Sequence, residues 1–272
     1  MTGNPVSQNL SHGYYLTVPH QLEKDVQVKE TARVLGALCE SANLLVSWYQ
    51  TIEILPYEKR MHRLHPLANQ YLKDDDDRTP VKFEYVDMLK PPFATCTIFL
   101  ARECGSNRQI VVKFVSSYSA EAHQALASAG RAPELLYCGP VWNEFEPSSA
   151  YNVGCPYQMV VMEYVEGDKL EDVQISERQR VIDAVQHALS IFHEKGFVHG
   201  DIRMPNVIVA KGEDGSSVYE RVKILDFDWA GKKKEARYPP DLSNKIAWAD
   251  GTESSGLIEP EHDVHMARQL YG

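Results

Sequence analysis

The sequence predicts an α+β fold, and three observations support this class. Several runs between residues 81 and 165 are β-branched or alternate apolar with polar residues, which is typical of strands. Two stretches with apolar residues at helical spacing, 26–55 and 176–195, lie outside these runs. After the second stretch, two β-branched runs flank an Asp-Gly turn, which predicts a hairpin. The 272 residues, 43% of them hydrophobic, can build one two-lobed domain or two small ones.

Residues 26–55 predict one long amphipathic helix. Its apolar stripe contains residues seven apart and others between them: Val28, Leu35, Ala42 and Tyr49, with Leu38, Leu45 and Ile52. We expect this stripe to pack on the rest of the domain. The alternative is a coiled coil with a partner bound through residues 26–55.

The strand-rich part contains a lysine in an unusual setting. Strands are predicted at residues 81–86, 97–101 and 109–115, followed by a short helix at 120–129. Lys113 lies in the third strand, flanked by valine and phenylalanine. A lysine inside such an apolar run needs a counter-charge, because an unpaired buried charge is costly. The alternative is an edge-strand lysine whose ammonium group reaches solvent along its aliphatic stem.

The second half of the chain begins with further strands and a clear helix. Strands are predicted at residues 135–138 and 158–165. The helix at 176–195 opens with Ser176 and Gln179, the spacing of a capping box, and Gly196 ends it. The pair His62 and His65 has no further ligand nearby, so we expect a surface role rather than a metal site. His262 and His265 are expected to be exposed helix residues rather than a metal site.

Composition restricts the setting and the partners. The formal net charge of −10 argues against a nucleic-acid or anionic-membrane partner, because both favour a basic surface. The five cysteines are odd in number and form no Cys-x-x-Cys pair, which suits reduced thiols. No leader sequence and no membrane-spanning apolar run is evident. We expect a soluble protein of the cytoplasm, with the nucleus as the alternative.

The residues with the most chemical information follow the helix at 176–195. Asp201 and Asn206 form an Asp-x-x-x-x-Asn loop, and Asp226 follows the predicted hairpin in the sequence Asp-Phe-Asp. In phosphoryl transfer from a nucleotide, one carboxylate meets the attacking hydroxyl. An amide and a second carboxylate hold Mg²⁺ on the phosphates. The order of these three residues fits that chemistry.

The stretch from residue 197 to 231 resembles the catalytic core of the protein-kinase superfamily. HGDIRMPN stands where protein kinases carry H-R-D-x-x-x-x-N, and DFD stands where they carry D-F-G. The glycine of HGD is shared with kinases of the aminoglycoside phosphotransferase type and with atypical kinases of the RIO type. The chain also resembles compact kinase-like proteins of fungi, in which four motifs occur together: HGDIRxPN, DFDWAG, RYP and a terminal HD.

This resemblance implies a two-lobed protein-kinase-like fold with a truncated C-terminal lobe and an N-terminal helical extension. The extension would be residues 1–79, the N-terminal lobe residues 80–165, and the C-terminal lobe residues 166–272. The truncation follows from the short stretch after Gly231, where no A-P-E sequence is present.

The resemblance also assigns the nucleotide-binding residues. Lys113 would grip the α- and β-phosphates of ATP and pair with Glu121 in the short helix. Met162 would lie at the back of the adenine pocket. The backbone of Glu163 and Val165 would hydrogen-bond the adenine edge.

The catalytic residues follow in the same way. Asp201 would orient or deprotonate the acceptor hydroxyl, Arg203 would steady the transferring group, and Asn206 and Asp226 would hold Mg²⁺. His199 is expected to bond the loop rather than carry a proton. Asp263, in a last helix predicted at residues 260–270, would brace the catalytic loop from below.

Two functions compete. The preferred one is an ATP- and Mg²⁺-dependent phosphotransferase acting on a hydroxyl, with a protein serine or threonine slightly favoured over a small molecule. The alternative is a catalytically weak pseudokinase that serves as a nucleotide-binding or partner-binding scaffold. Residues 87–95 favour the scaffold, because they contain two prolines and none of the glycines with which kinases cover the phosphates. The complete Lys, Asp, Asn and Asp set favours the enzyme.

Overall fold

The computed structural model describes residues 21–51, 68–73, 78–89, 97–141, 157–212 and 216–271. The chain divides into two units, Met1–His65 and Pro66–Gly272. Each unit is described by itself. The pair His62 and His65, residues 90–96 and the Asp-Gly turn of the hairpin lie outside the described residues.

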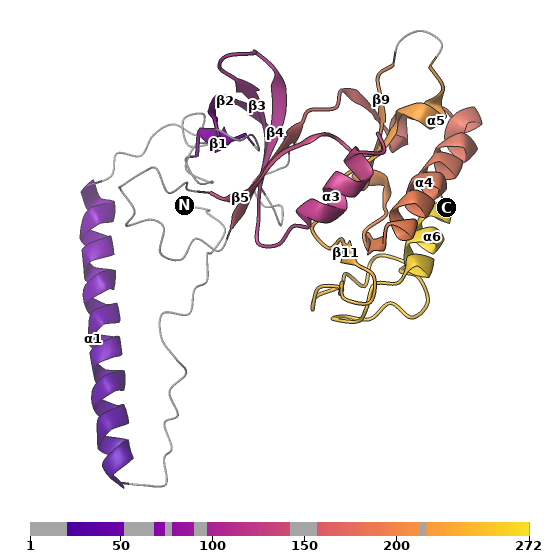
Figure 1. The fold of residues 1–272 in the computed structure, drawn as a ribbon. Helices are drawn as coiled ribbons and strands as arrows, with labels where there is room; N and C mark the ends of the chain where they lie inside the picture. The colour runs from indigo at the N-terminus through magenta and orange to yellow at the C-terminus, as the bar shows by residue number, and fades with distance from the viewer. Residues whose placement is uncertain are drawn as a thin grey trace. The chain divides into compact units, whose positions relative to one another are not determined.

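The first unit contains one long helix, α1 (Gln21–Thr51), drawn in indigo in Figure 1. The helix predicted at residues 26–55 is confirmed over residues 26–51 and begins earlier, at Gln21, whereas residues 52–55 lie outside the described residues. Its stripe residues Val28, Leu35 and Leu38 are exposed. Among the described residues, no helix has the length and apolar character needed to cross a bilayer.

The second unit begins with a six-stranded antiparallel sheet in the order β1-β2-β3-β4-β6-β5. Its strands are β1 (Gln70–Leu72), β2 (Pro80–Met88), β3 (Thr97–Glu103), β4 (Gln109–Val115), β5 (Leu135–Pro140) and β6 (Gln158–Glu163). The strands predicted from sequence are therefore present. The start of the sheet moves from residue 80 to Gln70, because β1 pairs with β2.

The alternation of side chains along β4 gives the sheet two different faces. Ile110, Val112 and Phe114 point to a buried apolar cluster that includes Met159 and Val161 of β6. Lys113 points to the opposite face, because successive side chains of a strand alternate. The register pairs Val111 with Met162 and Lys113 with Val160, so these residues share that face.

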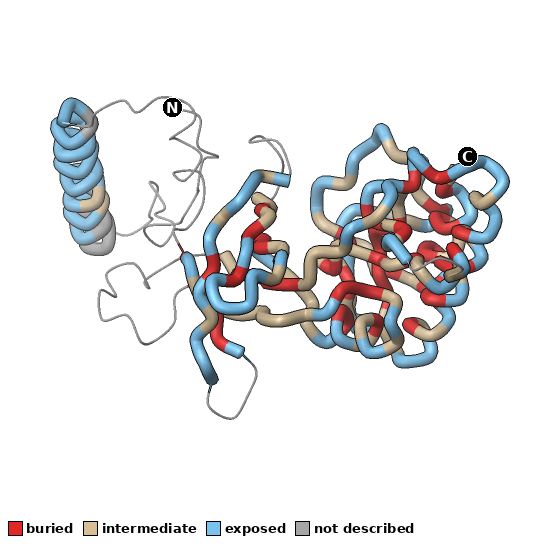
Figure 2. Tube along the Cα trace, turned by 90° about the horizontal axis from the view of Figure 1, so that it is seen from above, coloured by how far each residue is buried: buried red, intermediate tan, exposed pale blue. Residues whose placement is uncertain are grey.

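Four helices accompany the sheet among the described residues of the second unit. They are α3 (Ala120–Ala127), α4 (Arg178–Glu194), α5 (Val218–Arg221) and α6 (Pro260–Arg268). Three 3₁₀ turns, at Leu170–Asp172, Ile175–Glu177 and Met204–Asn206, accompany them. The predicted stripe of α4 is buried in one core with α3, α5 and α6. Figure 2 shows buried stretches gathered in this part of the unit, around the C-terminus.

The beginning of α4 differs from the sequence-based prediction. The turn Ile175–Glu177 precedes the helix, its N-cap is Glu177, and no side-chain cap hydrogen bond forms. The capping box of Ser176 and Gln179 is therefore wrong. Gly196 does end the helix, with φ +83°, a left-handed conformation that favours glycine.

Two small sheets place the loops of the candidate site. The predicted hairpin is confirmed, since β9 (Val207–Ala210) pairs antiparallel with β10 (Val222–Ile224), although α5 lies between them. β7 (Gly167–Lys169) forms the third strand of that sheet. A Cβ on Gly167 would lie 2.3 Å from the Val209 carbonyl oxygen, so this close strand approach requires glycine. β8 (Phe197–Val198) pairs with β11 (Gly231–Lys232).

Candidate active site

The loop from His199 to Asn206 is held by hydrogen bonds on both sides. The Nε2 of His199 lies 3.1 Å from the Leu225 carbonyl oxygen, and its Nδ1 accepts the Asp201 N–H at 3.2 Å. A carbonyl oxygen only accepts, so Nε2 carries the proton and the ring is neutral. Both ring nitrogens are engaged in the loop, which confirms the structural role expected for His199.

Asp263 of α6 braces the same loop from outside it. Its carboxylate accepts hydrogen bonds from the backbone N–H of His199 at 2.8 Å and of Gly200 at 2.7 Å. It also meets the Nε2 of His193 at 3.0 Å, and only 1% of its side chain is exposed. This contact agrees with the brace expected from the sequence. Gly200 has φ +81°, and a Cβ there would lie 2.6 Å from Ile258 Cδ1, so a side chain would strain the loop.

The carboxylate of Asp201 is fixed by two neighbours in the loop. Arg203 donates to both of its oxygens, with Nη2 to Oδ2 at 2.7 Å. Asn206 Nδ2 donates to the Asp201 backbone oxygen at 2.9 Å and to Oδ2 at 2.7 Å. These bonds occupy the amide nitrogen of Asn206 and leave the amide oxygen as the atom that can ligate a cation.

Lys113 meets two aspartates from the sequence Asp-Phe-Asp. Its Nζ lies 2.6 Å from Asp226 Oδ1 and 2.5 Å from Asp228 Oδ1, and only 2% of its side chain is exposed. The expected pair with Glu121 is wrong: 71% of the Glu121 side chain is exposed, and it pairs with Lys232 at 3.2 Å. The lysine is therefore buried and paired, as an apolar strand requires, but with a different acid.

Asp228 experiences opposing electrostatic influences. Burial and the neighbouring carboxylate of Asp226 raise its pKa to about 7, and Lys113 opposes the rise. Asp226 itself has φ +68°, a conformation that few residues other than glycine adopt. The charge of Asp228 near neutral pH therefore depends on both Asp226 and Lys113.

Phe227, between these two aspartates, anchors the segment in the core. It is fully buried and stacks on His123 of α3, with ring centroids 4.6 Å apart and an interplanar angle of 7°. His123 Nε2 contacts the Pro133 carbonyl oxygen at 2.8 Å, and its Nδ1 contacts Tyr118 Oη at 2.8 Å. Burial lowers the pKa of His123 to about 4, so the ring is neutral at physiological pH.

The segment after β6 passes along the edge of the candidate site. Met162 is buried on the same sheet face as Lys113. Glu163 pairs with the backbone of Glu134 through its own N–H, at 2.9 Å, and through its carboxylate, at 3.1 Å. Among the described residues, none hydrogen-bonds the backbone of Val165, so its N–H and C=O are available to a ligand.

Aromatic side chains surround the other side of Arg203. The guanidinium carbon of Arg203 lies 5.7 Å from the ring centroid of Trp248, which packs against Trp229 and Tyr238. His262 Nδ1 meets Tyr238 Oη at 3.2 Å and accepts the Glu259 N–H at 3.3 Å. His262 is 8% exposed, so the expectation that it is exposed was wrong.

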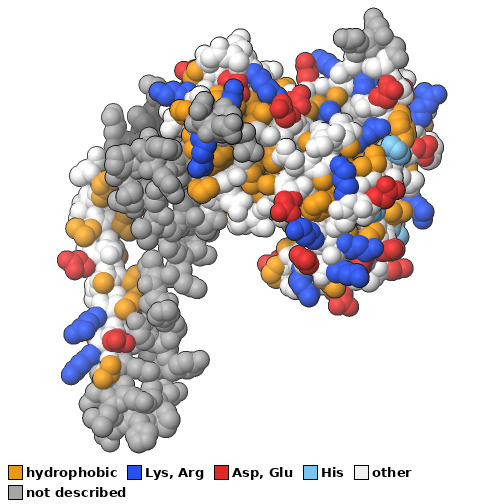
Figure 3. Space-filling model, in the orientation of Figure 1, with side chains coloured by type: hydrophobic (Ala, Val, Ile, Leu, Met, Phe, Trp, Pro, Cys, Tyr) orange, Lys and Arg blue, Asp and Glu red, His pale blue; other side chains and the backbone are white. Residues whose placement is uncertain are grey.

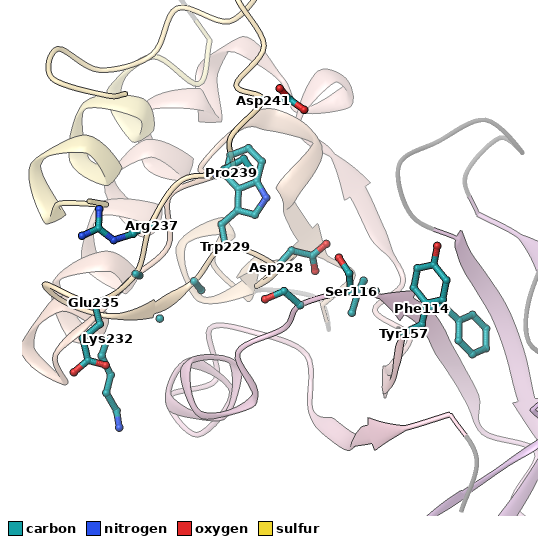
Figure 4. Close-up of a pocket in the computed structure, with 15 residues that line it drawn as sticks. Phe114, Ser116, Tyr157, Asp228, Trp229, Lys232, Glu235, Arg237, Pro239 and Asp241 are labelled. Carbon is teal, nitrogen blue, oxygen red and sulfur yellow. The ribbon is translucent and has the colours of Figure 1, made fainter. Parts of the chain in front are cut away.

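A cavity of about 690 Å³ opens beside Asp228. Figure 4 shows Asp228 and Ser116 across from each other, with Trp229 and Pro239 nearby. The cavity is lined mainly by the end of β4 and by the segment after Asp226. The lining includes Lys232, Glu235, Arg237 and Asp241. Figure 3 shows charged side chains of both signs interspersed over the visible face of this unit.

The donor set fits a magnesium ion. Mg²⁺ prefers oxygen ligands and keeps several waters or phosphate oxygens besides one or two carboxylates. The carboxylate of Asp226 and the side-chain amide oxygen of Asn206 supply such ligands. The Leu225 N–H donates to the backbone carbonyl oxygen of Asn206 at 2.8 Å, which links the two segments. The described residues contain no cluster of three or more His, Cys, Asp or Glu side chains suited to holding a metal alone. An ion held by these two ligands would complete its shell with waters or phosphate oxygens, as Mg²⁺ commonly does.

Three participants of the site were not identified from the sequence. Asp228 was visible as the acidic third residue of Asp-Phe-Asp, in a place where kinases carry glycine. His123 and Trp248 carried no sequence signal, because their partners Phe227 and Arg203 are distant in the chain. The structure does bring together Lys113 with Asp226, and Asp201 with Arg203 and Asn206.

A buried lysine that faces two aspartates, together with an Asp-Asn loop, matches the site that the sequence resemblance predicts. A family model described as "Protein kinase domain" matches residues 95–243, which is more than half of the chain. The chain therefore belongs to the protein kinase family, and its fold is of the protein-kinase-like α+β class.

Of three similar proteins, two have kinase names and one is a subunit of a complex. The KEOPS complex subunit Bud32 of Pyrococcus abyssi is 34% identical over 84 residues, 29% of this chain and 34% of that protein. A probable serine/threonine-protein kinase iksA of Dictyostelium discoideum is 25% identical over 134 residues, covering 44% of this chain and 14% of its own. The serine/threonine-protein kinase drp72 of Corynebacterium efficiens is 25% identical over 190 residues, 64% of this chain and 34% of its own. The chain thus spans about a third or less of the length of these relatives.

Among solved structures, the Cydia pomonella granulovirus kinase PK-1 is 16% identical and covers 59% of this chain and 58% of its own, with a TM-score of 0.42.

Proposed function

We propose that this kinase transfers the γ-phosphate of ATP to a hydroxyl acceptor in a Mg²⁺-dependent reaction. The observation that carries the proposal is the meeting of Lys113 Nζ with Asp226 and Asp228, at 2.6 and 2.5 Å. Such a group supplies a cation for phosphate oxygens and carboxylates for a metal in one place. A protein serine or threonine is slightly favoured over a small molecule as the acceptor, because Arg203 stands where serine/threonine kinases carry a lysine.

The nucleotide would lie on the sheet face that carries Lys113 and Met162. In this proposal the available backbone groups of Val165, next to Glu163, bond the adenine edge. The ammonium group of Lys113 holds the α- and β-phosphates. Bound Mg²⁺, held by Asn206 and Asp226, supplies neutralisation of the phosphate charge.

The loop residues act on the acceptor. Asp201 accepts the acceptor hydroxyl's hydrogen bond and so directs its oxygen at the phosphate. Because Arg203 and Asn206 fix both the position and the rotamer of this carboxylate, little orientation is left to be gained during the reaction. Arg203 also places positive charge next to the transferring group. This division of roles needs no proton carrier other than Asp201, which agrees with the neutral, bonded state of His199.

The experiment that tests the proposal is a γ-phosphate transfer assay on the purified chain. Protein and small-molecule acceptor panels are run side by side with labelled ATP, with and without Mg²⁺. We expect Mg²⁺-dependent transfer to one panel, and none from the Asp226→Asn variant. A wild-type chain that binds ATP but transfers phosphate to no acceptor and not to water would instead support the pseudokinase scaffold.

We also propose the cytoplasm as the site of action, with the nucleus as the alternative, and α1 as a surface for a partner. Fractionation of cells that express the chain, and recovery of partners with and without residues 21–51, test these two points. Partner recovery that does not depend on α1 would contradict the second.

A further inference from the structure

Lys113 needs a counter-charge, because it is buried. With 2% of its side chain exposed, water cannot stabilise the ammonium group. Two acids close to it in the fold or the sequence compete for this role: Glu121 on α3 and Asp228 after β10. Only Asp228 reaches Nζ, at 2.5 Å, whereas Glu121 is 71% exposed and pairs with Lys232.

We propose that Asp228, the third residue of Asp-Phe-Asp, is the positioning residue that holds Lys113 in place, and that no acid of α3 does so. The inference rests on the proposed function for its consequence, since a positioned Lys113 is what would grip the phosphates. Its geometric basis is independent of nucleotide, because the contacts of Lys113 with Asp226 and Asp228 are within the chain.

The position of Asp228 explains why one aspartate is not enough. Asp226 Oδ1 also contacts Lys113, but the same carboxylate is the proposed ligand of Mg²⁺. When a divalent cation shares Asp226, the attraction between Asp226 and Lys113 weakens, because the carboxylate charge is partly neutralised. Asp228 then remains as the acid that is dedicated to the lysine.

The acid of helix α3 takes no part in this pairing. Glu121 joins α3 to Lys232 of β11, at 3.2 Å, and this pair is exposed to solvent. Helix α3 contacts the aspartate segment through His123, which stacks on Phe227. Because Asp226 and Asp228 are two residues apart, any movement of their segment carries the proposed metal ligand and the partner of the lysine together.

A thermodynamic cycle tests the contact without any nucleotide. The variants are Lys113→Met, Asp228→Asn and their combination, with Glu121→Gln as the matched control that also removes one acid. Losing Lys113 leaves Asp226 and Asp228 facing each other unneutralised, so Asp228→Asn should be more favourable in that background than in wild type. We expect the change in melting temperature caused by Asp228→Asn to differ by at least about 2 °C between wild type and the Lys113→Met background. Glu121→Gln should have the same effect in both backgrounds.

Nucleotide affinity tests the consequence. Asp228→Asn should weaken Mg²⁺–ATP binding, measured by calorimetry, by about tenfold or more, since one partner of a buried charge pair is lost. Glu121→Gln should stay within about twofold, and Asp228→Glu, which keeps the carboxylate, should recover part of the affinity. A merely structural role for Asp228 would lower the melting temperature without moving the affinity of the folded fraction.

The outcomes separate the two claims. Additive effects of Lys113→Met and Asp228→Asn, or coupling of Lys113 with Glu121 instead, would overturn the inference. Wild-type protein that binds no nucleotide would overturn the proposed function, and the thermodynamic cycle alone would then decide on the inference.

Discussion

The two sides of the candidate site are held in place by different means. On the sheet side, strand register sets the position of Lys113, with Val160 opposite it and apolar neighbours around it. On the loop side, Asp201 is placed by hydrogen bonds from Arg203 and Asn206, and the loop itself by Asp263 of α6. Because of this difference, we expect sheet-side changes to act on nucleotide binding and loop-side changes to act on turnover or on folding.

The largest expected effect is on the loop side. Asp201→Ala should reduce turnover by on the order of 10²–10⁴, because it removes the group that acts on the acceptor. ATP affinity should stay nearly unchanged, since Lys113 keeps Asp226 and Asp228, and Asn206 keeps its hydrogen bond to the backbone oxygen of residue 201. Turnover and calorimetric affinity, measured on the same preparation, check this. A parallel loss of both would show that the two sides are not separable.

A second change removes the brace of the loop. Asp263→Ala leaves the N–H groups of His199 and Gly200 buried without acceptors, so the free energy of unfolding should fall by about 2–5 kcal/mol. Asp250→Ala is the matched control, since Asp250 is exposed in the segment before α6. Urea unfolding measures both. Equal, small losses would mean that Asp263 does not support the loop.

The free energy of unfolding should depend on pH through His123, which stacks on Phe227. His123 has a pKa of about 4 in the fold, compared with about 6.5 in an unfolded chain. Its contribution to stability is therefore complete above pH 6.5 and is lost as the pH falls toward 4. At pH 5 the loss is about 2 kcal/mol relative to pH 7.5. The free energy of unfolding is measured at pH 7.5 and pH 5 for wild type and for His123→Asn. Its fall between these pH values should be smaller in the variant by about that amount. An identical decline in wild type and variant would contradict the assignment.

The smallest effect is expected in the segment after Asp226. Gly200 stands where many protein kinases carry an arginine that receives an activating phosphate, so no such receptor is present in the loop. A variant with alanine at four positions, Ser243, Thr252, Ser254 and Ser255, should retain turnover within a few-fold of wild type. A large loss, restored by acidic replacements, would reveal a phosphorylation switch.

Periodicity and turn chemistry predicted most of the fold. The buried stripe of α4 and the strands β3 and β4 followed from apolar spacing, because burial on one face imposes it. The capping box at Ser176 failed because the chain there forms a 3₁₀ turn before the helix. Such local alternatives differ little in energy, so a motif of two residues does not decide between them.

The site was predicted less completely, and the reason is its long-range contacts. Asp201, Asn206 and Asp226 were identified because they lie in one motif-rich stretch. The partner of Lys113 is 115 residues away, and sequence spacing has no information on which acid reaches it. His262 was misplaced for the same reason, since its burial depends on Tyr238.

The central claim, that Asp226 holds Mg²⁺ on a nucleotide next to Lys113, is tested most directly by ligand-dependent stability. The free energy of unfolding is measured with ATP at about a hundred times its dissociation constant, with and without Mg²⁺, for wild type and for Asp226→Asn. ATP should stabilise wild type by about 2.7 kcal/mol only when Mg²⁺ is present, and the variant should lose most of that gain. A Mg²⁺-dependent gain of the same size in Asp226→Asn would contradict the account.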